Sequence, residues 1–405
     1  MFHKRKRSSS HRKHHFILIL SVVIVALAIL MYTRPLPALY PINDVKAVTA
    51  ASNVSLAWPA IGEAAIGATN YGVLTTNGTQ TMRPTASTAK LITALTVLKR
   101  YPLPLGQQGP TITLNGADVA IYNKYAAENG SVAKVVAGEE ISEYQMFQAM
   151  LLPSANNMAD SLATWAFGSL SEYSVAAKQL VSSLGLTNTK VGSDASGFLP
   201  DTVSTAHDLM LLGQATMQNP VLAQIVNQTK ATLPIAGVVT NVNWMIGEDG
   251  VIGIKTGNTD QAGGVYIFAS QYLLDKTHSV TIIGTIQGVP TLQDSMNDAI
   301  PLLDSAKQNF NLSTPVKASQ TVAHYDVPWS NAVNAIATKN VSVVTWAAST
   351  PQLIPALHAI YAPENTGAQV GTLSTVLYGS TTENVVLQHA IHAPPWWWRI
   401  IRHKL

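Results

Sequence analysis

The sequence predicts an α+β protein in which one larger domain combines helices with an antiparallel sheet and a small β-rich domain follows. Residues 86–99 have a helical pattern, with leucines at spacings of four and three. The runs at 251–254, 265–269 and 280–286 are rich in β-branched residues and are separated by turn-forming segments. Helices and neighbouring antiparallel strands are therefore expected in the same domain.

Composition narrows the function classes. The chain has 405 residues, of which 47% are hydrophobic and 12% are charged, so it can bury a sizeable core and is not a disordered protein. The two termini carry nine of the 25 Lys and Arg and no acid, so the stretch between them is net acidic. An acidic body argues against nucleic acid as a partner. The absence of cysteine excludes a disulfide scaffold, a thiolate zinc site and a Cys nucleophile.

The N-terminus predicts a membrane anchor. Residues 16–32 are uncharged and follow a basic segment, 1–15, that holds six Lys and Arg. This apolar run is just long enough to span a bilayer, and the positive-inside rule leaves residues 1–15 in the cytoplasm and the rest outside the cell membrane. A cleaved signal peptide is the competing interpretation, but no A-x-A site follows at the expected distance. A buried core helix does not explain the preceding cations.

Two further segments flank the predicted domains. Residues 33–55 are rich in Pro, Ala, Asn and Ser without periodicity and are interpreted as a linker. Residues 394–405 combine three Trp with Arg399, Arg402 and Lys404, a composition typical of a segment at a membrane interface, with membrane lipid as its partner. A terminal strand that packs its Trp residues on the domain is the alternative.

Between these ends, residues 56–312 form the predicted α+β domain. Pro153 interrupts its long helical stretch, and no internal repeat is present. Residues 316–393 contain short β-prone runs separated by turns and predict the small β domain. The remaining predicted elements are a strand at 64–74, a helical stretch at 140–167 and a closing helix at 302–310.

Metal chemistry and a conventional serine triad both lack support. None of the eleven His forms an H-E-x-x-H pair, so no metal site is expected. His207 follows Thr205, which forms a capping box with Asp208, so a structural position in the first helical turn is expected for it. The candidate serines lack the flanking glycines of a G-x-S-x-G elbow.

One constellation of short motifs carries chemistry. Ser87 and Lys90 are three residues apart at the start of a helix, so the amine can reach the hydroxyl. An amine beside an apolar helix and a second lysine should have a lowered pKa and can act as a general base. The other motifs are Ser154-Ala155-Asn156, which lies where the helical pattern breaks, and Lys255-Thr256-Gly257, which ends a β-branched run. Gly257 is expected to leave room for a substrate backbone beside the strand. Segments with the same spacings but no comparable context occur at 10–13 and 295–297.

The order and context of these motifs resemble the penicillin-recognising serine D,D-peptidases, in particular the low-molecular-mass D-alanyl-D-alanine carboxypeptidases. The similarity extends to RPTASTAKLITAL, AGEEISEYQMFQAMLLPSANNMADSLA, LGLTNTKVGSDASGFLPDTVSTAHDLMLL and GVIGIKTGNTDQAGGVYIFAS. The resemblance implies a β-lactamase-like domain followed by a small β-sandwich domain. It also implies removal of the terminal D-Ala from peptidoglycan stem pentapeptides, inhibition by β-lactams and no cofactor.

The resemblance implies roles for the motif residues. Ser87 would be acylated, with Lys90 as its base, and Ser154 would relay a proton to the leaving D-Ala. Asn156 would hold the substrate amide, Lys255 would be an electrostatic partner and Thr256 would face the substrate carboxylate. The oxyanion hole would be formed by the backbone N–H groups of Ser87 and Asn258.

Two departures from the family pattern stand out. Asn258 replaces the residue that is more often an aromatic, His or Thr, although only its backbone is needed. Residues 289–298 contain no Arg, whereas the family commonly has a carboxylate-binding Arg there. Arg83 or Lys124 could fill its place; otherwise a weaker demand for a free carboxylate is expected.

Three other functions compete with the carboxypeptidase. The missing Arg leaves room for a D,D-endopeptidase on cross-linked stems and for an inactive wall-binding module. A class A β-lactamase is less favoured, since neither Glu172 nor Glu248 is followed by Asn at the required spacing.

Overall fold

The computed structural model describes residues 9–46, 54–347 and 349–402, and the chain divides into two compact units. Residues 52–311 form one, named here the large unit. Residues 1–51 and 312–405 form the other, named the terminal unit because it contains both chain ends.

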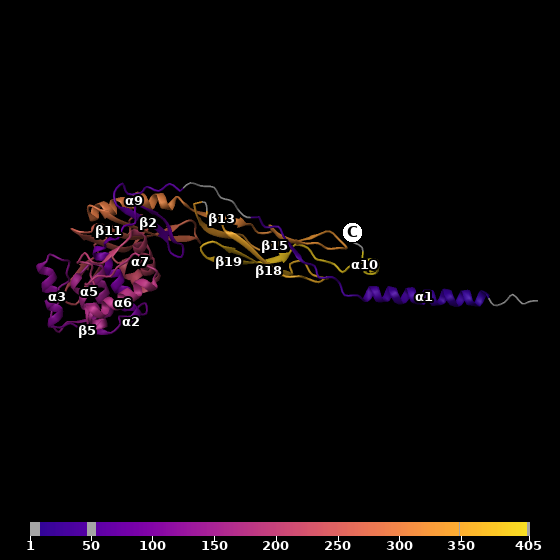
Figure 1. Ribbon diagram of the computed structural model, residues 1–405, viewed down its shortest axis with the longest axis horizontal. Helices are drawn as coiled ribbons and strands as arrows, with labels where there is room; N and C mark the ends of the chain where they lie inside the picture. Colours follow the sequence, from indigo (N-terminus) through magenta and orange to yellow (C-terminus); the bar gives the residue numbers. More distant parts are fainter. Residues whose placement is uncertain (1–8, 47–53, 348, 403–405) are drawn as a thin grey trace, which may run out of the picture. The chain divides into compact units, whose positions relative to one another are not determined.

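The large unit is built on a five-stranded sheet in the order β10-β11-β12-β2-β3, with every neighbouring pair antiparallel. Helix α9 packs against β11 and β12, whereas α7 packs against β12, β2 and β3 on the opposite face (Figure 1). The strands are β2 (Glu63–Ala68), β3 (Gly72–Asn77), β10 (Val251–Thr259), β11 (Gly263–Leu273) and β12 (Ser279–Val289).

Most α-helices of the large unit begin at polar caps, as the sequence chemistry favours, whereas α2 and α5 begin after Ala89 and Ala155. Thr205 caps α7 by accepting from the Asp208 N–H, and Ser142 and Gln145 form a capping box at α4. The helices are η1 (Ala86–Ala89), α2 (Lys90–Arg100), α3 (Gly116–Ala127), α4 (Glu143–Leu151), α5 (Asn156–Phe167), α6 (Leu170–Ser183), α7 (Ala206–Gln218), α8 (Pro220–Val226), η2 (Glu248–Gly250) and α9 (Leu292–Lys307).

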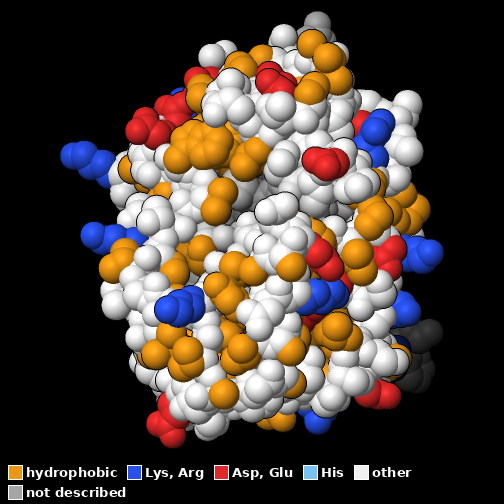
Figure 2. Space-filling model, turned by 90° about the vertical axis from the view of Figure 1, so that its left-hand side faces the viewer, with side chains coloured by type: hydrophobic (Ala, Val, Ile, Leu, Met, Phe, Trp, Pro, Cys, Tyr) orange, Lys and Arg blue, Asp and Glu red, His pale blue; other side chains and the backbone are white. Residues whose placement is uncertain are grey.

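Three short two-stranded antiparallel sheets complete the large unit. They are β4 (Arg83–Pro84) with β7 (Val203–Ser204), β5 (Thr111–Thr113) with β6 (Glu140–Ser142), and β8 (Lys230–Leu233) with β9 (Gly237–Thr240). The face visible in Figure 2 is mostly uncharged, and its acidic and basic side chains are interspersed, as expected from the low content of charged residues.

The terminal unit contains a six-stranded sheet in the order β1-β14-β15-β19-β18-β17 and a separate β13-β16 pair. Its core includes Tyr325, Val370, Leu373 and Val385, all fully buried. Its strands are β1 (Pro41–Asn43), β13 (Phe310–Val316), β14 (Thr321–Tyr325), β15 (Val333–Ala337), β16 (Val341–Trp346), β17 (Gln352–Leu357), β18 (Gln369–Val376) and β19 (Ser380–Leu387). Its helices are α1 (Ser9–Thr33) and α10 (Trp396–Ile401).

The α+β fold class is confirmed, and α1 contains an apolar stretch, Arg12–Thr33, long enough to cross a membrane. The linker predicted at 33–55 is wrong for its first half. Leu39 is buried and bridges Ile360, and β1 adds to the sheet edge at β14. A short strand at a sheet edge pairs its backbone groups with those of its neighbour and needs no alternation of apolar and polar side chains. The sequence therefore contains no signal for this strand. Residues 47–53 lie outside the described residues.

Three other element predictions need correction. The strand predicted at 64–74 is the β2–β3 hairpin, turned at Thr69–Tyr71. The stretch predicted as helix at 140–167 begins instead with β6, whereas its predicted interruption at Pro153 is confirmed by the break at 152–155 between α4 and α5. The closing helix predicted at 302–310 begins at Leu292, because Thr291 and Asp294 form a capping box.

Candidate active site

Three segments of the large unit meet at the predicted site. Ser87 lies in η1, a short 3₁₀ turn that leads into α2, and the segment before it is held by pairing of β4 with β7. Ser154 lies in the break between α4 and α5, and Lys255 lies in β10. Ala86 and Ser154 both have a positive φ, 45° and 64°, which is costly for residues other than glycine. The fold therefore holds both serine-bearing turns in unusual backbone conformations.

Lys90 is the centre of the hydrogen-bond network. Its Nζ lies 2.8 Å from Ser87 Oγ, 2.7 Å from Asn156 Oδ1 and 3.0 Å from the Ser196 carbonyl oxygen. The Lys90 side chain is fully buried, whereas Ser87 is partly exposed. Besides its bond to Cε, the Lys90 nitrogen has three tetrahedral positions for a hydrogen or a lone pair. Asn156 Oδ1 and the Ser196 carbonyl take up two of them, so the third is directed at Ser87 Oγ.

Lys255 forms a second buried amine next to the first. Its Nζ donates to Ser154 Oγ at 2.9 Å and to the Thr256 carbonyl at 3.0 Å. The structure thus joins Lys90 with Ser87 and Asn156, and Lys255 with Ser154, as two hydrogen-bonded groups.

Burial changes the ionisation of both lysines. Desolvation lowers the pKa of Lys90 to about 7, although the carboxylates of Asp194 and Asp160 oppose this change. Desolvation also holds the pKa of Lys255 well below its usual range, and the neighbouring Lys90 charge adds to the effect. A neutral amine is therefore available at Lys90 near pH 7, which is the state a general base requires.

Gly257 allows a close approach of two backbone segments within the protein. A Cβ at this position would lie 3.0 Å from the Thr85 carbonyl oxygen and 3.2 Å from the Ser87 backbone nitrogen. Glycine therefore lets β10 approach η1 and brings the Ser87 N–H beside the strand that carries Asn258. Thr256 is buried beside Lys255, and Asn258 is exposed.

A loop at residues 194–198 supports Lys90 and was not predicted from the sequence. Asp194 Oδ2 accepts from the Ser196 N–H and hydroxyl and from the Phe198 N–H, which orients the Ser196 carbonyl toward Lys90. Asp160 accepts from the Ala195 N–H and the Tyr125 hydroxyl. The motif S-D-A-S-G was visible in the sequence, but nothing local showed that its carbonyl faces Lys90.

The two cations considered as replacements for the missing arginine lie in different places. The Arg83 Nε is 3.7 Å from Glu63 Oε1, and the side chain passes against Gly288 at the end of β12. Lys124 is exposed on α3, with its Nζ 5.0 Å from the Tyr125 ring centre. Arg83 thus lies beside the segment 289–298 that lacks an arginine.

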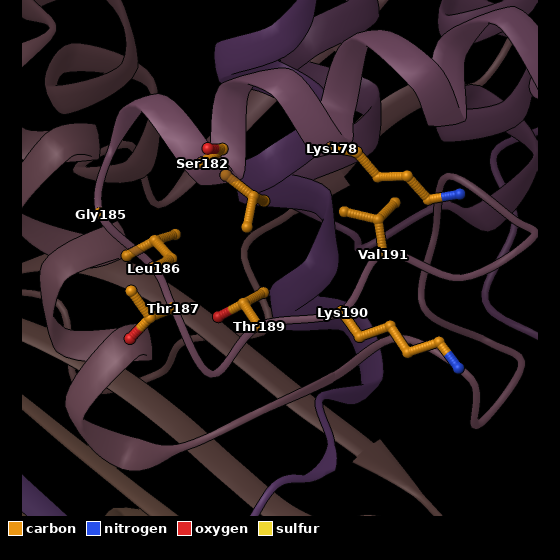
Figure 3. A pocket seen from close by; sticks show the side chains of 9 residues that line it. Lys178, Ser182, Gly185, Leu186, Thr187, Thr189, Lys190 and Val191 are labelled. Carbon is orange, nitrogen blue, oxygen red and sulfur yellow. The ribbon is translucent and has the colours of Figure 1, made fainter.

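Two cavities of the large unit bear on the assignment. One of about 520 Å³ is lined by Asn258 and Thr259 at the end of β10, by Asp260 and by residues 290–293, so it adjoins the site and contains no Lys or Arg in its lining. Another of about 370 Å³ lies between α6 and residues 185–191, where Lys178 and Lys190 extend to the same side (Figure 3). This second cavity includes none of the predicted site residues.

The remaining candidates behave as structural residues. His207 lies in the first turn of α7 with its Nδ1 3.0 Å from Asp208 Oδ1. Within the described residues, no group of three His, Cys, Asp or Glu side chains is arranged to hold a metal ion.

Comparisons with known proteins agree with this geometry. The model of the D-alanyl-D-alanine carboxypeptidase family matches residues 60–282. A D-alanyl-D-alanine carboxypeptidase of a Streptomyces species is 27% identical over 57% of this chain and 81% of its own length. One from Mycobacterium tuberculosis is 31% identical over 46% of this chain and 62% of its own length.

Solved structures share the fold. Penicillin binding protein 5 from Haemophilus influenzae has a TM-score of 0.58 and 18% identity, covering 85% of this chain and 100% of that one. A Streptomyces DD-transpeptidase has a TM-score of 0.54 and 22% identity, covering 63% of this chain and 98% of that one. Because the family model matches more than half of the chain, the protein belongs to the D-alanyl-D-alanine carboxypeptidase family of serine peptidases.

Proposed function

We propose that the protein is a serine-type D-alanyl-D-alanine carboxypeptidase that removes the terminal D-Ala from peptidoglycan stem pentapeptides. The observation that carries this proposal is the 2.8 Å contact between the partly exposed Ser87 hydroxyl and the fully buried Lys90 amine. Relatives named D-alanyl-D-alanine carboxypeptidase support the substrate class.

In the first step, Ser87 Oγ attacks the carbonyl carbon of the scissile D-Ala-D-Ala bond and Lys90 Nζ takes its proton. The protonated Lys90 keeps hydrogen bonds to Asn156 Oδ1 and the Ser196 carbonyl. The backbone N–H groups of Ser87 and Asn258 stabilise the oxyanion, a contribution of about 3 to 4 kcal/mol per donor. Asn156 would thus position Lys90, in addition to the expected contact with the substrate amide.

In the second step, the C–N bond breaks, and the proton that Lys90 took from Ser87 passes through the Ser154 hydroxyl to the leaving D-Ala amine, so Lys90 is neutral again. Ser154 is held for this transfer by the hydrogen bond that it accepts from Lys255. The product is an ester on Ser87. Water then attacks this ester, Lys90 accepts the water proton, and the shortened stem peptide leaves with Ser87 restored.

Benzylpenicillin tests this assignment, because it reacts with the same nucleophile and releases no leaving group. Intact-mass spectrometry should show one equivalent of a slowly hydrolysed adduct on wild type and none on Ser87→Ala. Labelling of Ser87→Ala would overturn the assignment of the nucleophile. Rapid turnover of the adduct would favour a β-lactamase. The two glutamates considered for that activity, Glu172 in α6 and Glu248 in η2, are both exposed.

A second candidate, D,D-endopeptidase action on cross-linked stems, is favoured by the cavity of about 520 Å³ beyond Asn258. Its lining offers hydroxyl and amide groups and one acid, Asp260, but no cation for a terminal carboxylate. A relative named D-alanyl-D-alanine endopeptidase, from Escherichia coli, is 31% identical over 46% of its own length.

The ratio of kcat/KM for a D-Ala-D-Ala peptide to that of its C-terminal amide separates the two activities. One charge-assisted contact contributes about 10- to 150-fold, so a ratio above about a thousand would exclude a relaxed demand for the carboxylate. Loss of the preference in Arg83→Gln would identify Arg83 as the carboxylate-binding cation.

We also propose that one helix anchors the protein in the cell membrane. The apolar helix α1 is compatible with a single-pass anchor, and the six preceding cations favour a cytoplasmic N-terminus with both units outside. Protease added outside intact cells should reach residues 56–393, and failure to do so would reverse this orientation.

A further inference from the structure

Two cavities of the large unit follow one another along helix α9. The strand-end cavity is the one of about 520 Å³ that contains Asn258 and Gln293. The Trp244 cavity, of about 350 Å³, contains Trp244, Asn297 and Ile300. Gln293, Asn297 and Ile300 recur at spacings of four and three, so they lie on the same side of α9. Gln293 Nε2 donates to Asn297 Oδ1 at 2.8 Å, which connects the polar side chains of the two cavities.

Trp244 presents its indole to solvent from a fixed loop. The side chain is 51% exposed, although its two neighbours in the chain, Asn243 and Met245, are buried. Asn243 Oδ1 accepts from the Tyr266 hydroxyl of β11 at 3.0 Å and from the Met245 N–H at 3.2 Å. The loop is therefore attached to the central sheet. A large aromatic side chain held in this way loses little conformational entropy when a ligand packs on it.

The charge of the two cavities restricts the kind of ligand. The described residues that line them include three acids, Asp260, Glu248 and Asp249, and no Lys or Arg. Lys307 balances part of this charge, since its Nζ lies 3.6 Å from Asp249 Oδ1. An anionic ligand would be repelled here. A ligand rich in hydroxyl and amide groups is matched, because carboxylates accept from hydroxyls and the two side-chain amides on α9 both donate and accept.

The Trp244 cavity lies within reach of the group that carries the stem peptide. Because an α-helix rises 1.5 Å per residue, Ile300 lies about 10 Å beyond Gln293 along α9. An extended stem of five residues spans up to about 17 Å. A stem that is bound at Ser87 and passes Asn258 can therefore place its attachment point in the Trp244 cavity. In peptidoglycan that point is an amino sugar, joined to the stem by an amide and rich in hydroxyl and acetamido groups.

We propose that Trp244 and the side of α9 formed by Gln293, Asn297 and Ile300 bind the glycan strand of peptidoglycan. The apolar face of a sugar ring packs on the indole and on Ile300, and the two amides bond to the hydroxyl and acetamido groups. This inference depends on the proposed function, because the stem held at Ser87 brings the sugar to this site. Its consequence is a preference for stems that are attached to glycan over free stem peptides.

The first test compares two substrates with full-length protein in detergent, the free pentapeptide and the same pentapeptide attached to its disaccharide. In the wild type, kcat/KM should be about 10-fold higher for the sugar-linked form, the effect of one well-placed aromatic contact. In Trp244→Ala, the ratio of the two values should fall to about one. Tyr361→Ala is the matched control, because Tyr361 is an exposed aromatic residue of the terminal unit, and it should keep the wild-type ratio.

The second test measures glycan binding without any reaction at Ser87. The probe is the N-acetylglucosamine tetramer, which has the sugar backbone and acetamido groups but no stem and no charge. Isothermal titration calorimetry should show binding to the wild type that is about 10-fold weaker in Trp244→Ala. The double variant Gln293→Ala/Asn297→Ala changes two exposed side chains on α9 and should also weaken binding. Near-ultraviolet circular dichroism checks the fold of each variant.

The proposal is overturned if the tetramer does not bind the wild type, or if both variants bind it as strongly as the wild type. It is also overturned if Trp244→Ala lowers kcat/KM for both substrates by the same factor, because the Trp244 cavity would then hold peptide. Failure of the peptidase assignment is recognised separately. In that case benzylpenicillin does not label Ser87, whereas the tetramer still binds and Trp244→Ala still weakens its binding.

Discussion

The two units of this protein use the same kind of cation contact for different purposes. Lys90 and Lys255 in the large unit and Arg402 in the terminal unit all donate to backbone carbonyls. The lysines are fully buried, so desolvation lowers their pKa and allows them to lose a proton. An arginine stays charged in any protein environment. The comparison shows that burial and residue type together decide whether a cation performs chemistry or holds two elements together.

The largest effect is expected when Lys90 is replaced by arginine. Lys90→Arg keeps a positive charge and donors but removes the titratable base, so acylation by benzylpenicillin should slow by about 100- to 10,000-fold. The measurement is the second-order rate constant from intact-mass spectrometry. Lys178→Arg, at an exposed position outside the site, should leave the rate unchanged. A Lys90→Arg rate within a few-fold of the wild type would exclude Lys90 as the base.

The pH dependence of acylation tests whether Asp194 and Asp160 influence the pKa of Lys90. Lys90 must be neutral to accept the Ser87 proton, so the rate should fall as pH decreases through about 7. Asp194 and Asp160 raise the pKa of Lys90, so Asp194→Asn should move this fall to lower pH. Burial and the same two carboxylates raise the pKa of Tyr125 and Tyr173, and burial and the Lys90 charge lower that of Lys255. The acylation rate has to be measured over the full pH range, because a purely structural defect would lower the rate without moving the pH at which it falls to half its maximum.

Asp201→Asn is the control for this profile. Asp201 Oδ2 accepts from the Ser193 N–H and hydroxyl in the same loop, but its charge is not among those that act on Lys90. An unchanged midpoint in Asp194→Asn, or an equal shift in Asp201→Asn, would contradict the electrostatic role of Asp194.

The buried lysines should also change the pH dependence of stability. The pKa of Lys90 is about 7 in the folded chain against an ordinary value of 10.5, so between these limits the unfolded chain binds a proton that the folded chain does not. The free energy of unfolding should therefore rise with pH over this window, by at most about 1.4 kcal/mol per pH unit for one group. Urea titrations in detergent should give a smaller slope for Lys90→Met. An identical slope would show that Lys90 stays protonated in the folded state.

The reverse exchange at the terminal unit should have the smallest effect. Arg402→Lys retains the charge but loses the planar pair of donors to Arg34 and Pro35. Loss of one such hydrogen bond corresponds to about 1 kcal/mol, measured as the free energy of unfolding in detergent. The rate of penicillin acylation should not change in Arg402→Lys. A changed rate would mean that Arg402→Lys and Lys90→Arg both affect the acylation reaction.

Local sequence predicted the elements whose signals are local. Ser87 and Lys90 are three residues apart, so helical geometry alone brings the amine to the hydroxyl. The β-branched runs predicted β10, β11 and β12 as neighbours, and the charge-free run predicted the apolar helix α1. The start of α9 was not predicted, because it depends on the capping box of Thr291 and Asp294 and not on apolar periodicity. The strand β1 was not predicted, because three residues are too few to show an alternation of apolar and polar side chains.

By itself, the sequence determined the pairing of Ser87 with Lys90, the strand that carries Lys255 and the apolar helix α1, because each depends on contacts or periodicity over a few residues. Only the tertiary structure decided how Lys90 is held. Asn156 lies 66 positions from it and Ser196 lies 106, whereas Ser154 lies 101 positions from Lys255. It also decided that Gly257 serves the approach of β10 to η1, and that Arg402 reaches Arg34 across 368 positions. Burial and long-range contacts are properties of the packed chain, and they set both the pKa of the base and the attachment of the C-terminal helix.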